Sequence, residues 1–127
     1  MTCLAGDIVA FYSTTAGKRK YHLCITAVSA TAAGQFLFLN SGSGRKSDCI
    51  LSNADFPCIS PSATGLSVVS FSTLVRVSAL QLPHLVLAVL GSLQPGVARQ
   101  LEGFAASVPT LTAADRRTIL AALAAIT

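Results

Sequence analysis

Two short cationic clusters are the residues best suited to bind a charged ligand. Lys18-Arg19-Lys20 and Arg45-Lys46 contain five of the nine Lys and Arg residues. Such clusters can hold a phosphate group, and Arg19 can do so with two parallel N–H bonds, whereas a lysine supplies a point charge. A solvated cationic face is the ordinary alternative for any single cluster. The formal net charge is +4, and six of the nine cations precede Leu82, so the positive field belongs to the front of the chain.

Aromatic and imidazole side chains lie beside the first cluster. Tyr12 and Tyr21 could stack on unpaired bases, and packing in the core or at its rim is an equal alternative. His22 could accept a proton, but we expect it to be a packed or half-exposed strand histidine rather than a general base.

Most familiar catalytic signatures are absent from the chain. It has no phosphate-binding glycine motif of nucleotide-binding proteins, no His-Glu-x-x-His and no Gly-x-Ser-x-Gly. The stretch 41–47 is interpreted as a flexible basic loop, because a strand-like segment and not a helix follows it. With five carboxylates, an acid pair for glycoside hydrolysis has little support, and Asp48 and Asp55 are expected to cap turns or pair with cations.

The cysteines and histidines do not predict a metal site. The four cysteines, Cys3, Cys24, Cys49 and Cys58, lie far apart and form no Cys-x-x-Cys pair. In a chain expected to be cytoplasmic, this favours buried, reduced thiols over disulfides. His22 and His84 add no zinc-ligand spacing, so we predict no metal and no cofactor.

The front two-thirds of the chain predicts β structure. Runs of β-branched and aromatic residues bounded by Gly, Ser, Asn and Pro indicate strands over 7–12, 21–28, 35–40, 48–51, 67–72 and 74–77, the last two being one broken strand or two short ones. The connections include 14–20, with the first cationic cluster, and a longer stretch, 53–65, with two prolines. Without a crossover helix, such strands indicate a small antiparallel barrel or a strongly twisted sheet.

The rear of the chain predicts two or three helices. Pro83 suits a first helical turn, and 84–90 is apolar almost all round, which favours a buried helix. Pro95 opens a second helix, and Thr112 is expected to cap a third, with Asp115 three residues on as in a capping box. The fold class is therefore α+β in a single domain, 1–127, with its β part over 1–82 and its helical part over 83–127.

Bulk composition predicts a folded chain outside the membrane. Hydrophobic residues make up 52% and charged residues 11%, which suits a real core and argues against disorder. The apolar run 85–90 is far shorter than the roughly 18 residues of a membrane span. The first residues show no basic stretch followed by a long apolar segment, which is the pattern of a secretory signal. We therefore expect a cytoplasmic protein. The apolar helices are expected to cover the sheet, with a homodimer as the alternative.

The order of several short motifs carries a family resemblance. Gly6-Asp7-Ile8-Val9 is followed by a basic loop running into a strand that ends at Thr26, by a strand ending in Leu39-Asn40-Ser41, and by Ser67–Ser70 leading to Leu74–Val77. Over about residues 5–82 this order resembles the PemK/MazF family. The resemblance implies an SH3-like barrel with a C-terminal helix, and a toxin of a type II toxin–antitoxin pair. It also implies a cognate antitoxin as partner and metal-independent cleavage of single-stranded RNA.

The resemblance also implies the site residues. In that family the 2′-hydroxyl attacks the neighbouring phosphate, which requires a proton acceptor, a fixed cation and a donor for the leaving oxygen. The family places an arginine, usually followed by proline, where its basic loop enters the second strand, and a threonine or serine after the third. Here the matching positions, and the expected catalytic residues, are Arg19 or Lys20 and Ser41, with Tyr21 in place of the proline. The expected RNA-binding residues are Lys18, Tyr21, Arg45 and Lys46.

Two other functions fit the same residues. A non-catalytic SH3-like barrel module would use the basic loops to bind nucleic acid or an acidic protein partner. A structural protein would use the apolar helices as a homomeric interface and the cations for solubility.

Overall fold

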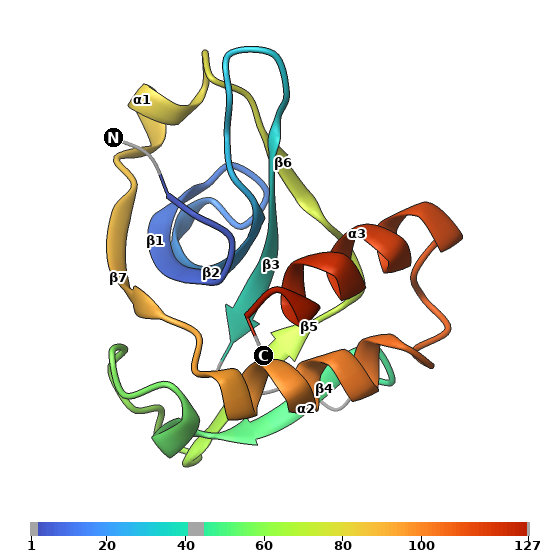
Figure 1. Cartoon of the computed structure of the whole chain (residues 1–127). Helices are drawn as coiled ribbons and strands as arrows, with labels where there is room; N and C mark the ends of the chain where they lie inside the picture. The colour runs from blue at the N-terminus through green and yellow to red at the C-terminus, as the bar shows by residue number, and fades with distance from the viewer. Residues whose placement is uncertain (1–2, 41–44, 127) are drawn as a thin grey trace.

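An antiparallel β-sheet with its two long helices against one face forms the body of the computed structural model, which describes residues 3–40 and 45–126 (Figure 1). The strands are β1 (Asp7–Ser13), β2 (Lys18–Thr26), β3 (Gly34–Asn40), β4 (Asp48–Ser52), β5 (Leu66–Ser70), β6 (Val75–Val77) and β7 (Ala88–Ser92). The helices are the 3-10 turn η1 (Asn53–Asp55), α1 (Leu82–Leu85), α2 (Pro95–Ala105) and α3 (Ala113–Ala124). Their content confirms the α+β class.

The strand order is β4-β5-β3-β2-β1-β7, and every neighbouring pair is antiparallel. β6 pairs with the start of β3 and β5 with its end, so the broken strand expected over 67–77 is present as two short strands along one side of β3. Among the described residues, β4 and β7 are the edge strands and the sheet is open.

Two apolar clusters bury the two faces of the sheet. Leu23 and Ile25 of β2 belong to the larger cluster, which α2 and α3 cover with Leu101, Ile119 and Leu123. The second, smaller cluster lies on the other face and consists of Cys3, Val9, Phe11, Cys24, Phe36, Val77, Leu85 and Leu87. Because side chains alternate along a strand, β2 can serve both clusters, and its apolar run is continuous for that reason.

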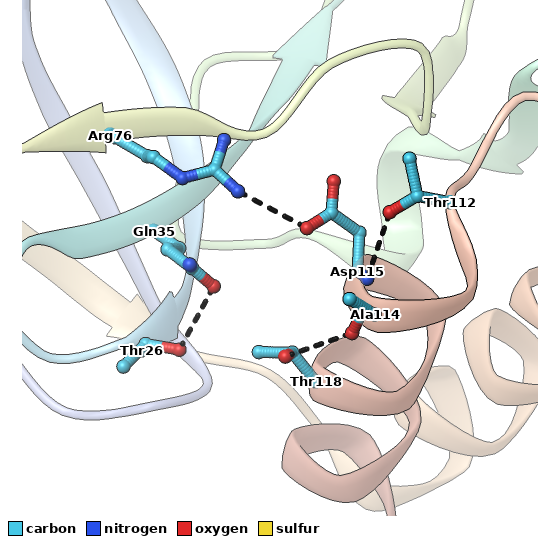
Figure 2. Close-up of polar contacts among 7 residues, drawn as sticks. All are labelled: Thr26, Gln35, Arg76, Thr112, Ala114, Asp115 and Thr118. Carbon is cyan, nitrogen blue, oxygen red and sulfur yellow. Dashed lines mark hydrogen bonds and ion pairs between the residues drawn. The ribbon is translucent and has the colours of Figure 1, made fainter.

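An N-cap begins α3, and an ion pair in its first turn connects the helix to the sheet. Thr112 accepts a hydrogen bond at Oγ1 from the backbone N of Asp115, 3.1 Å away, as expected of an N-cap. Asp115 Oδ1 accepts from Arg76 Nη2 of β6 at 3.1 Å (Figure 2), so this carboxylate links α3 to the sheet. The complete capping box lies in η1 instead, where Ser52 and Asp55 cap each other, and this confirms the expectation that Asp55 caps a turn.

The prediction of a buried helix over 84–90 is wrong. Helix α1 is a single turn that stops at Leu85, Val86 takes a left-handed backbone conformation with φ 52°, and the chain continues as β7. β7 pairs with β1 through Val9–Val89 and Ala10–Ala88. An apolar run is compatible with either a buried helix or a strand, and here the backbone groups on the free side of β1 require a partner.

The first cationic cluster also lies in a different element from the one expected. β2 begins at Lys18, so the three cations belong to the strand and not to the preceding loop. Lys18, Arg19 and Lys20 pair with Ser13, Tyr12 and Phe11 of β1. The turn between the strands is short because Gly17 takes φ 70° and its N–H bonds to the carbonyl of Ser13 at 2.8 Å.

Within the described residues, no helix has the length and apolar character that crossing a membrane requires.

Candidate functional site

A pocket of about 250 Å³ opens at the cationic end of β2. Three parts of the chain form it: the start of β2, the end of β3, and the segment that runs from η1 to β5. Its described lining residues are Lys18, Arg19, Lys20, Tyr21, Leu39, Asn53, Ile59, Ser60, Ser62 and Ser67. This pocket is called the basic pocket below.

The cations form one side of the basic pocket. Lys18 and Arg19 are exposed and Lys20 is partly exposed. Arg19 Nη1 donates a hydrogen bond to the carbonyl oxygen of Val86 at 2.7 Å, which anchors one edge of its guanidinium beside the pocket. A guanidinium carries five N–H donors, so this bond leaves others to meet an anion.

A hydrogen-bonded serine–asparagine cluster also lines the pocket and is called its second wall, or serine wall, below. Asn53 Oδ1 accepts from Ser67 Oγ at 2.9 Å and from Ser62 Oγ at 3.4 Å, and Asn53 Nδ2 donates to the Ser62 carbonyl at 3.3 Å. The backbone N of Asn53 donates to the Gly65 carbonyl at 3.1 Å. These bonds hold η1, the 59–62 segment and the start of β5 together, so this wall is built before any ligand arrives.

Part of the lining of the basic pocket, called its floor below, is apolar. Tyr21 and Leu39 are paired across β2 and β3, and Leu39 is buried while Tyr21 is half-buried. Ile59 and Tyr21 both pack against the larger core cluster. Cations and hydroxyls around an apolar floor suit a ligand with an anionic group and a flat or apolar body.

The structure brings some of the expected site residues together and separates others. Lys18, Arg19, Lys20 and Tyr21 line one pocket. Arg45 and Lys46 are exposed and are not among its described lining residues. Ser41, the expected donor after the third strand, lies outside the described residues.

Sequence reasoning missed the second wall. Asn53, Ile59, Ser60 and Ser62 come from the connection 53–65, which was interpreted only as a long stretch with two prolines, and Ser67 comes from the strand expected over 67–72. The length of that connection was the available signal, because connections much longer than a tight turn often carry binding residues.

His22 is a packed core residue, which agrees with the expectation from the sequence. Its ring is fully buried and stacks on Phe11 with ring centres 3.7 Å apart, and Nδ1 lies 3.0 Å from the Lys20 carbonyl. Nε2 is buried without a hydrogen-bond partner. Burial lowers the pKa of His22 to about 4, and this effect outweighs the hydrogen bond to Lys20. His22 is not among the described residues of the basic pocket.

In the described part of the chain, no three His, Cys, Asp or Glu side chains gather as metal ligands. Comparisons of the chain with models of protein families, with curated proteins and with solved structures give no match.

Proposed function

We propose that the basic pocket binds single-stranded RNA and that the chain is a PemK/MazF-like toxin, a metal-independent endoribonuclease. One observation carries the proposal: Lys18, Arg19, Lys20 and Tyr21 share a pocket with serine hydroxyls and an apolar floor. Phosphates need the cations, and an unstacked base needs an aromatic or apolar surface beside them. The short antiparallel strands also suit the SH3-like barrel of that family, although the described part of the sheet stays open at β4 and β7.

Arg19 is the best-placed cation for the phosphate. Its bond to Val86 fixes one edge of the guanidinium, so less side-chain entropy is lost when the remaining N–H groups meet a phosphate. In cleavage by the 2′-hydroxyl, a fixed cation stabilises the charge that grows on the phosphate oxygens. Lys20 adds a second positive charge, and Ser41 is the proposed donor to the leaving oxygen.

The proposal includes the partners and the place of action that the resemblance implies. An acidic segment of a cognate antitoxin would cover the same cations and so block RNA, because both ligands are polyanions. A toxin of this kind would act in the cytoplasm, where its RNA substrate lies, and a homodimer through the apolar surface is part of the same proposal.

Binding without cleavage is the second candidate function. No carboxylate or imidazole occurs among the described lining residues of the basic pocket, and His22, the nearest imidazole in sequence, is buried in the core. Those are the groups that most often accept the proton of an attacking hydroxyl. This observation favours a module that holds nucleic acid, or an acidic protein partner, without cutting it.

The deciding experiment compares three proteins on single-stranded RNA in the presence of a chelator. They are the wild type, Arg19→Ala/Lys20→Ala, and a control, Arg99→Ala/Arg117→Ala, which removes the same charge from exposed positions on α2 and α3. The proposal expects cleavage by the wild type and the control and a loss of at least about tenfold in the pocket variant, equivalent to about 1.4 kcal/mol. Intact RNA in all three samples excludes the endoribonuclease.

Salt dependence separates the candidate functions if RNA stays intact. Each phosphate neutralised by a cation contributes about −0.7 to the slope of log affinity against log salt for a single strand. Removing two pocket cations is therefore expected to reduce the slope by about 1.4. An affinity for RNA equal in the pocket variant and the control variant would remove the basic pocket from both proposals.

A further inference from the structure

Two thiols touch in the second core cluster. The Sγ atoms of Cys3 and Cys24 are 3.5 Å apart, and both side chains are buried. Cys24 belongs to β2, and Cys3 belongs to the N-terminal arm, here residues 3–6, which precedes β1. Neither thiol is among the described residues of the basic pocket, so this pair is separate from the site proposed above.

Backbone hydrogen bonds hold the N-terminal arm against β2. Gly6 N donates to the Cys24 carbonyl at 2.8 Å. Asp7 N donates to the Leu4 carbonyl at 3.0 Å, and Leu4 N donates to Asp7 Oδ2 at 2.8 Å, which closes a turn. Gly6 takes φ 90°, a conformation that favours glycine. These backbone hydrogen bonds therefore hold the N-terminal arm in the position that brings the two sulfur atoms into contact.

We propose that Cys3 and Cys24 form a reversible disulfide and that the pair is an oxidation site fastening the N-terminal arm to β2. A peroxide is the oxidant. The Cys3 thiolate attacks one peroxide oxygen and becomes a sulfenic acid while the other oxygen leaves as hydroxide. Cys24 sulfur then attacks the Cys3 sulfur, the S–S bond forms, and the sulfenic oxygen leaves as water. Two thiols and one hydrogen peroxide give one disulfide and two waters, and a dithiol reverses the change.

The contact couples the ionisation of the two thiols. The hydrogen bond between the two thiols lowers the pKa of Cys3 and raises the pKa of Cys24. Burial raises the pKa of Cys49 and of Cys58. The thiolate is the reactive form, and Cys3 begins the proposed reaction because it lies on the arm that opens while Cys24 stays in β2.

The two sulfurs need to move little to form a bond, and the oxidant reaches them through the N-terminal arm. A disulfide bond is about 2.05 Å long, so two sulfurs already in contact have a short distance to close. The pair is buried, and the oxidant reaches it when the N-terminal arm opens away from β2, because segments outside strands and helices open more readily than core strands. The resulting bond closes a loop between residues 3 and 24 and restricts the unfolded chain, which stabilises the folded state.

A peptide map of the oxidised protein tests the proposal. Trypsin cuts after Lys18, Arg19 and Lys20, and it therefore separates Cys3 from Cys24, whereas Cys49 and Cys58 stay together in peptide 47–76. Native protein is treated with an equimolar amount of hydrogen peroxide, free thiols are alkylated, and the digest is analysed by mass spectrometry. We expect the peptide ending at Lys18 to be linked to peptide 21–45 and the link to disappear after dithiothreitol.

Two comparisons make the result specific. Oxidation in guanidinium chloride should give mixed pairings that include peptide 47–76, because the contact between Cys3 and Cys24 exists only in the fold. The oxidised native protein should also unfold at a higher temperature than the reduced one, a difference absent from Cys3→Ser. If Cys3→Ser does not fold, the wild-type peptide map still decides.

Cys58 offers the competing outcome, since it is the most exposed of the four thiols. If exposure alone governed oxidation, peptide 47–76 would be the main oxidised product of the native protein. That product, or an equal yield of the 3–24 link in native and denatured samples, overturns the proposal.

Discussion

Arg19 of β2 and Val86, 67 positions later, are joined by a hydrogen bond of 2.7 Å from the guanidinium to the backbone carbonyl. Among the described residues, Val86 is the one non-glycine residue with positive φ. A β-branched residue in that conformation is strained. The bond therefore connects a cation of the basic pocket with the strained junction between α1 and β7.

Replacing Val86 with glycine is expected to stabilise the protein. Glycine removes a left-handed backbone penalty of about 1 kcal/mol, and little burial is lost because Val86 is 70% exposed. Val89→Gly is the matched control, since Val89 is 44% exposed in strand β7 and glycine there should cost about 0.5–1 kcal/mol. Urea unfolding measures both. A loss of stability in Val86→Gly would mean that the left-handed turn costs nothing.

Charge-conserving exchanges should distinguish Arg19 from Lys20. Arg19→Lys keeps the charge but loses the planar donor set that could bond Val86 and a phosphate at the same time, so the proposed function expects RNA affinity to fall about tenfold. Lys20→Arg keeps the charge and adds donors, and its loss of affinity should be smaller. Titration of labelled single-stranded RNA at fixed salt makes the comparison. Equal losses would show that only net charge matters at the site.

His22 should make stability depend on pH in a specific window. Its folded pKa of about 4 lies below its usual value near 6.5, so the unfolded chain binds the proton more readily between these values. The contribution of neutral His22 is complete above about pH 6.5 and is lost as pH falls toward 4. Between pH 7 and pH 5 the wild type should lose about 2 kcal/mol more than His22→Phe, which keeps the stacking on Phe11. Urea unfolding of both proteins at pH 7 and at pH 5 measures this difference. An equal loss of stability in the wild type and in His22→Phe would mean that the His22 ring is exposed to water.

Asn53 should support the serine wall of the basic pocket. Asn53→Ala leaves the buried Ser67 hydroxyl without its acceptor, which is expected to cost about 1–3 kcal/mol and to weaken RNA binding. Adding Ser67→Ala removes the orphaned hydroxyl, so the double variant should lose less than the sum of the single losses. Denaturant unfolding of the wild type, the two single variants and the double variant gives the coupling free energy between Asn53 and Ser67. Additive losses would mean that the two side chains act independently.

Gly91 should be required for β7 to approach the loop that carries Ile59 and Ser60. A Cβ at this position would lie 2.8 Å from Cys58 Cβ and 2.9 Å from Cys58 Sγ. We expect Gly91→Ala to cost about 1–3 kcal/mol and Cys58→Gly to restore part of that loss. Gly103→Ala is the control, because an added Cβ there has no neighbour within 4 Å and helix α2 should gain about 1 kcal/mol. Thermal unfolding measures the stability of these variants. Equal stability of Gly91→Ala and Gly103→Ala would contradict the expectation.

Local patterns in the sequence were enough for most elements of the fold. The strands β1 to β6 and the helices α2 and α3 lie where β-branched runs, turn residues, Pro95 and Thr112 predicted them. These signals act within a few residues, and the tertiary structure agrees with them. The packing of His22 followed in the same way from its place in an apolar strand.

The sequence by itself determined the cationic cluster, the strand from Tyr21 onward and the capped C-terminal helix, because each depends on neighbours in the chain. Only the tertiary structure decided the conformation of 84–92. Helix α1 ends at Leu85, and Ala88–Ser92 form β7 because the free side of β1 accepts a strand there. The tertiary structure also decided the second wall of the basic pocket and the omission of Arg45 and Lys46 from its described lining. Distances between segments remote in the sequence depend on how the sheet bends and packs, and no local pattern of residue types encodes them.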